Sequence, residues 1–93
     1  MSDKVINYLS GSYELSNKKL KSKEKTFLIR ERKKVTKSKP KYYLLGLNFN
    51  NKKAEYISSL YQVKNNLFKL DYQSKEYLLS FNGNSAIIKP IEL

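Results

Sequence analysis

The chain has 93 residues, which suits one domain and is too short for two independent cores, so we expect a single domain over residues 1–93. It contains no Cys and no His. This excludes disulfides, thiolate nucleophiles and metal sites built on Cys or His, and we expect no metal and no cofactor. The 19 Lys and Arg outnumber the 8 Asp and Glu, giving a formal net charge of +11 that favours an anionic partner.

The beginning of the chain is polar within three residues and lacks the apolar core of a signal peptide. No apolar run approaches the ~18 residues that a membrane span requires. We therefore expect a soluble, cytoplasmic protein without a membrane partner.

The positive charge is concentrated in the first part of the chain. Residues 1–41 carry thirteen basic and four acidic side chains, whereas residues 42–93 carry six and four. The segment 18–41 alone has twelve basic residues against Glu24 and Glu31. An ordinary lysine-rich surface explains the total, but clustering of this kind indicates an electrostatic patch or arm.

In chain order, residues 5–9 are predicted as a short strand or a helical turn. The segment 16–25, SNKKLKSKEK, is polar except for Leu20 and is predicted to be a flexible basic loop. A strand is predicted over 26–35 because apolar residues alternate there, which assigns Phe27, Ile29 and Val35 to the core. The same alternation predicts an exposed row of Arg30, Arg32 and Lys34 that could follow a phosphate backbone.

A basic loop is predicted over 36–41, where Pro40 lacks a backbone donor, and it leads into a central strand over 42–49. Residues 50–53 are predicted to form a turn. Residues 54–63 fit both a helix and a strand, and we favour the strand. Segments 67–73 and 76–83 are predicted to form a hairpin that brings together Phe68, Leu70, Tyr72, Tyr77, Leu79 and Phe81.

Asn82-Gly83 is typical of a hairpin turn, and Pro90 predicts that the last segment lies at a sheet edge. The predicted fold class is mainly β: a small antiparallel meander or barrel-like domain with at most one short helix, and α+β as the alternative.

No catalytic motif is found: the three glycines stand alone at positions 11, 46 and 83, and each acidic residue has a lysine nearby. We therefore expect a binding protein and no enzyme.

Binding to a nucleic acid requires positive charge and, for single strands, exposed aromatic rings. The sequence predicts such a site at Arg30, Arg32, Lys33, Lys34, Lys37, Lys39, Lys41, Tyr42 and Tyr43. Tyr42 and Tyr43 are adjacent in a predicted strand, so their rings point to opposite faces and one is a stacking candidate. With two arginines in total, sequence-specific readout is not expected.

Single-stranded DNA or RNA is the favoured partner. The alternative is a protein-interaction module, an assembly subunit or inhibitor, that docks an acidic protein surface on the same basic face. The sequence leaves open the choice between DNA and RNA and the oligomeric state.

Overall fold

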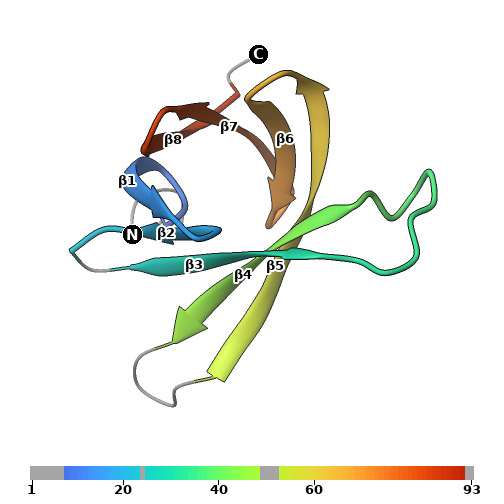
Figure 1. Cartoon of the computed structure of the whole chain (residues 1–93), viewed down its shortest axis with the longest axis horizontal. Helices are drawn as coiled ribbons and strands as arrows, with labels where there is room; N and C mark the ends of the chain where they lie inside the picture. Colours follow the sequence, from blue (N-terminus) through green and yellow to red (C-terminus); the bar gives the residue numbers. More distant parts are fainter. Residues whose placement is uncertain (1–7, 24, 49–52, 92–93) are drawn as a thin grey trace.

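The computed structural model describes residues 8–23, 25–48 and 53–91. Its strands form a closed barrel in which each strand pairs antiparallel with the next one, and the last pairs with the first (Figure 1). No helix occurs in these three ranges, so the predicted mainly β, barrel-like fold is confirmed. The strands are β1 (Gly11–Ser16), β2 (Lys19–Lys21), β3 (Thr26–Glu31), β4 (Tyr42–Asn48), β5 (Lys53–Lys64), β6 (Leu67–Tyr72), β7 (Lys75–Asn82) and β8 (Ser85–Pro90).

The barrel interior is filled by side chains that alternate along the strands. An antiparallel barrel of eight strands has an interior just wide enough for side chains to fill. Residues from five strands have no exposed surface at all: Leu20, Phe27, Leu44, Leu70 and Leu79. The predicted hairpin is present in β6 and β7, where Phe68 lies opposite Leu79 and Leu70 lies opposite Tyr77.

The order of the strands gives the barrel two different ends. Because successive strands run in opposite directions, alternate connections lie at the same end. The connections β1–β2, β3–β4, β5–β6 and β7–β8 surround one end, which we call the open end. The connections β2–β3 and β6–β7 lie at the other end, together with residues 8–10, which directly precede β1, and we call this the closed end.

Tyr8 and Leu9 fill the closed end. Leu9 has no exposed surface, and its carbonyl accepts a hydrogen bond of 2.6 Å from the hydroxyl of Tyr13. The ring centroid of Tyr8 lies 5.6 Å from that of Phe27. Gly46 makes room for this ring, since a Cβ at position 46 would lie 2.9 Å from the Tyr8 hydroxyl. The closed end is therefore packed like the core.

Two predictions in the first part of the chain are wrong. The predicted loop 16–25 contains strand β2, which forms because Leu20 is buried in the interior and pairs with Leu15 and Phe27. The strand predicted over 26–35 ends at Glu31, because β4 begins at Tyr42 and Glu31 is the last residue opposite it. Val35 is 55% exposed and is not a core residue.

The ambiguous segment 54–63 is a strand, as favoured, and belongs to β5. A bulge next to Ile57 disturbs the alternation and buries four residues in a row, Ile57 to Leu60, which explains why helical spacing also fitted. Residues 5–7 and 49–52, which carry parts of the predicted first element, central strand and turn, lie outside the described ranges.

Pro90 does not lie at a sheet edge, because β8 pairs with both β7 and β1. The last residue of β8 that pairs with β1 is Ile88, and Pro90 lies beyond it. Its missing N–H therefore removes no hydrogen bond of that pair. The turn predicted at Asn82-Gly83 is centred one residue later, on Gly83 and Asn84, with a φ of 62° at Gly83.

Candidate functional site

The connection between β3 and β4 extends away from the ring of strands (Figure 1). We call residues 32–41 the arm. Its ten residues, RKKVTKSKPK, include six basic side chains and no acidic one. Its backbone is tied at the base by the Arg32 N–H, which donates to the Lys41 carbonyl at 2.7 Å, and at the tip by two bonds between Thr36 and Lys39 of 2.9 and 3.2 Å. The chain thus presents a dense cluster of positive charge on a projecting hairpin.

Arg32 fixes the base of the arm to the barrel. Its guanidinium donates to the Pro40 carbonyl at 2.8 Å and to the Ser59 hydroxyl at 3.1 Å. It also lies 4.8 Å from the ring centroid of Tyr43 and 3.3 Å from the Tyr56 hydroxyl. Arg32 is therefore a structural anchor with its donors largely in use.

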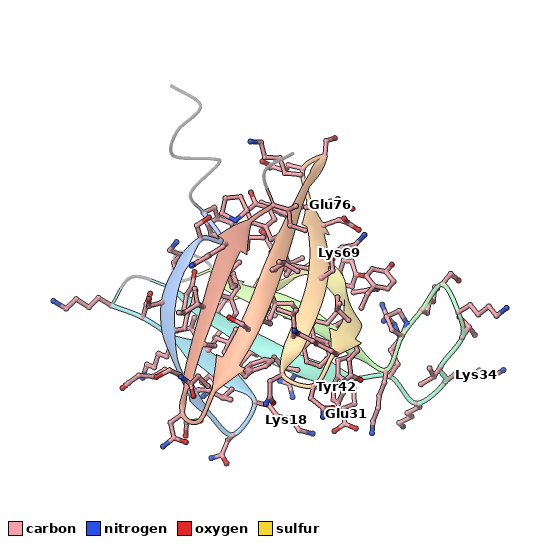
Figure 2. The ribbon with its side chains drawn as sticks, turned by 90° about the horizontal axis from the view of Figure 1, so that it is seen from above. Lys18, Glu31, Lys34, Tyr42, Lys69 and Glu76 are labelled. Carbon is pink, nitrogen blue, oxygen red and sulfur yellow. The ribbon has the colours of Figure 1, made fainter. Side chains whose placement is uncertain are left out.

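The prediction that Arg30, Arg32 and Lys34 form an exposed row along one strand is wrong. Only Arg30 lies on a strand, where it is exposed on the outer face of β3. Arg32 is half-buried in its contacts, and Lys34 lies far out on the arm (Figure 2). The spacing of a regular strand is lost here because β3 ends at Glu31 and the chain continues into the arm.

All five lysines of the arm are exposed, and four of them lie outside the ion pairs of the described residues: Lys33, Lys34, Lys37 and Lys39. The ion pairs in the described part of the chain are Lys18–Glu31, Lys41–Glu31 and Lys69–Glu76, so no carboxylate there neutralises these four. Like charges held on a short hairpin repel one another, and an anion placed among them relieves that repulsion.

Lys41, by contrast, is engaged at the edge of the open end. Its Nζ lies 3.5 Å from a Glu31 carboxylate oxygen and 5.3 Å from the ring centroid of Tyr42. Glu31 also pairs with Lys18, and this hydrogen bond lowers the pKa of Glu31 and raises that of Lys18. Figure 2 shows Lys18, Glu31 and Tyr42 close together at the lower edge of the barrel.

Tyr42 and Tyr43 point to opposite faces of β4, as strand geometry requires. Tyr43 lies on the outer face, where its ring is 6.0 Å from that of Tyr56 and is covered by Arg32. Tyr42 lies on the inner face, 6.2 Å from the ring of Phe68. Of the two predicted stacking candidates, Tyr42 belongs to the open end and Tyr43 to the base of the arm.

The open end of the barrel forms a hollow of about 1140 Å³. One of the residues that line this hollow is Leu60, which is only 2% exposed. Half-buried apolar and aromatic side chains make up its walls: Leu15, Ile29, Tyr42, Phe68 and Phe81. Its polar lining residues include Asn17, Asn66 and Asn84, which come from three different turns. We call this hollow the mouth.

The sequence-based prediction missed Phe68, Phe81 and the three asparagines of the mouth. A signal for them was present, because alternate turns of a meander lie at one end and three of these turns carry Asn. Asn17 and Asn66 adopt φ values of 51° and 63°, which Asn tolerates better than most residues. The backbone conformation of the turns is thus enough to explain the asparagines, so the sequence alone gives no reason to assign them to a binding site.

Comparison of the chain with models of protein families, with curated proteins and with solved structures finds no match. Within residues 8–23, 25–48 and 53–91, no group of three or more acidic, His or Cys side chains is placed to hold a metal ion. The described residues also contain no helix of the length and apolarity needed to cross a membrane.

Proposed function

We propose that this protein binds single-stranded nucleic acid through the arm, chiefly by contacts with phosphates and without strong sequence preference. The observation that carries the proposal is the set of four exposed arm lysines that no carboxylate neutralises within the described residues. A polyanion that binds there releases its condensed counterions, which is the main source of affinity in non-specific nucleic-acid binding.

The chemistry of the arm favours phosphate contacts over base reading. Lysine ammonium groups are flexible point charges, whereas bidentate recognition of a base edge relies on the planar fork of arginine. The only arginine on the arm, Arg32, uses its donors on Pro40 and Ser59. Specific readout by this segment is therefore not expected.

The test is fluorescence anisotropy with labelled single-stranded DNA, single-stranded RNA and duplex DNA over a series of salt concentrations. The expected result is binding in about the micromolar range at low salt, with log Kd rising steeply with log salt. A variant with Lys33, Lys34, Lys37 and Lys39 all replaced by Ser should bind at least about tenfold more weakly, with a salt slope smaller by about 3.

A matched control variant distinguishes the effect of the arm lysines from the effect of the net charge of the protein. Lys21, Lys23, Lys75 and Lys89 are also exposed, and they lie towards the closed end of the barrel. Replacing these four by Ser changes the net charge equally and should leave most of the affinity. Equal loss of affinity in both variants would show that overall charge is responsible, and the proposal for the arm would be abandoned.

One observation favours a second candidate, an acidic protein partner. Val35 on the arm is 55% exposed among lysines, and a mixed basic and apolar surface also suits a protein interface. Absence of binding to every oligonucleotide at low salt would favour this function, in which the arm docks one acidic partner.

A further inference from the structure

We infer that the mouth takes up one unstacked base of the bound single strand, so that the protein contacts bases as well as phosphates. This inference rests on the proposed function and adds a second site to it. It begins from the position of the mouth: the arm is the β3–β4 connection, and the turns that line the mouth are the β1–β2, β5–β6 and β7–β8 connections of the same end.

The walls of the mouth suit a flat ring. The Phe68 ring stands perpendicular to that of Tyr42 at 6.2 Å and perpendicular to that of Phe81 at 5.8 Å. A base can stack on one ring of such a set while its edge meets the face of a neighbouring ring, the two geometries that aromatic pairs prefer. Base–aromatic stacking of this kind tolerates every base, which agrees with binding without sequence preference.

The rim of the mouth offers hydrogen-bonding groups without partners. The backbone carbonyls of Asn66 and Asn84 accept hydrogen bonds from the Phe81 and Leu15 N–H groups, which holds both turns against neighbouring strands. Their side-chain amides, and that of Asn17, form no hydrogen bond with any described residue. An amide supplies both donors and an acceptor, which matches the mixed edge of a base.

The charges at the edge of the mouth beside the arm favour an anionic group there, although the lining of the hollow also includes the acidic residue Glu14. Lys18 lines the mouth, and Lys41 lies 5.3 Å from the Tyr42 ring centroid at the base of the arm. Both share one carboxylate, Glu31, so the cluster has an excess of positive charge. A phosphate beside Lys41 would therefore place the adjoining base near the wall formed by Tyr42.

A long acyl chain fits this hollow less well. It needs a deep, enclosed cavity, whereas the interior below the mouth is filled by Leu44, Leu70 and Leu79, which have no exposed surface. The mouth is thus a shallow site with aromatic walls and a polar rim, and a single planar group is the occupant that these features match.

The experiment compares a short oligothymidylate with an abasic deoxyribose–phosphate strand of equal length by anisotropy at one salt concentration. Both strands carry the same phosphates, so the arm treats them alike. The inference predicts that the oligothymidylate binds about tenfold more tightly. Equal affinity for the two strands would overturn the inference and leave the proposed function standing.

Two variants locate the effect. Phe68→Leu keeps an apolar side chain and should remove most of the preference for bases while leaving the affinity for the abasic strand unchanged. Asn66→Gly retains a residue that accepts the φ of 63° and should reduce the preference by about threefold through loss of the amide. The second variant keeps the test valid if thermal unfolding shows that the first one is destabilised.

The arm variant with four Lys→Ser replacements distinguishes the two proposals. It should weaken binding of both strands by the same factor and retain the preference for bases. A preference unchanged in Phe68→Leu and Asn66→Gly would place the base contact elsewhere and contradict the inference. Failure of the wild type to bind either strand at low salt would instead refute the proposed function and, with it, the mouth.

Discussion

The two ends of the barrel use the same kinds of side chain for different purposes. At the closed end, the partly exposed ring of Tyr8 packs edge to face on Phe27, and both Phe27 and Leu9 have no exposed surface. At the open end, the rings of Phe68 and Phe81 pack in the same way, but both members of this pair are only half-buried and line a hollow. The difference arises because Tyr8 and Leu9 pack into the closed end, while the connection between β3 and β4 leaves the open end as the arm.

An aromatic pair therefore has no fixed role in this fold. Where the backbone covers it, the pair adds to stability, and where the backbone leaves it open, it becomes a surface on which a ring can stack. The distinction is set by the connections between strands more than by the composition of the strands themselves.

Truncating the buried ring of the closed end should reduce stability most. Phe27→Ala should lower the free energy of unfolding by about 3–5 kcal/mol because Phe27 has no exposed surface and leaves a cavity. Phe68→Ala should cost clearly less, about 1–2 kcal/mol, because part of its ring already meets water. Urea unfolding of both variants measures the difference, and equal losses would show that the open end is packed as firmly as the closed one.

A smaller effect concerns the two arginines near the arm. Arg32→Ala should destabilise the protein by about 1–2 kcal/mol, since it removes a charged donor from Pro40 and Ser59. Arg30→Ala removes an exposed side chain and should change stability by less than about 0.5 kcal/mol. Thermal unfolding of the two variants measures this difference. An Arg32→Ala variant as stable as the wild type would contradict the role of Arg32 as a structural anchor.

The smallest effect is a pH dependence at the closed end. Burial raises the pKa of Tyr13, and also that of Tyr8, above the ordinary value for a phenol. Because the two phenols ionise at a lower pH in the unfolded chain than in the folded protein, their contribution to stability is fully present below about pH 10. That contribution is lost as the pH rises above this value. Tyr13→Phe should reduce this alkaline loss, which melting temperatures measured on both sides of pH 10 would reveal.

The local sequence pattern, chiefly the alternation of apolar and polar residues, predicted most of the fold. Alternation identified the inward residues of β6 and β7, and the strand favoured for residues 54–63 is present in β5 despite the bulge at Ile57. The errors occurred where pairing with neighbouring strands, and not the local sequence pattern, decided the structure of a segment. Leu20 looked isolated in a polar loop, yet one buried residue is enough to hold β2 between two neighbours.

The candidate site was predicted in part. The basic cluster from Lys33 to Lys41 and the opposed rings of Tyr42 and Tyr43 followed from the sequence. The anchoring of Arg32 by Ser59 did not, because these residues are 27 positions apart. The mouth needs residues of β1, β3, β4, β5, β6 and β7 together, and only closure of the barrel brings them to one place.

We propose that the open end and the arm, and not the closed end, contact the nucleic acid. Titration of isotope-labelled protein with oligothymidylate, followed by NMR, tests this residue by residue. We expect shifts of the backbone amides of the arm and of Lys18, Asn66 and Asn84, with little change at Leu9 and Ser74 of the closed end. Shifts confined to the closed end, or no shift at low salt, would contradict it.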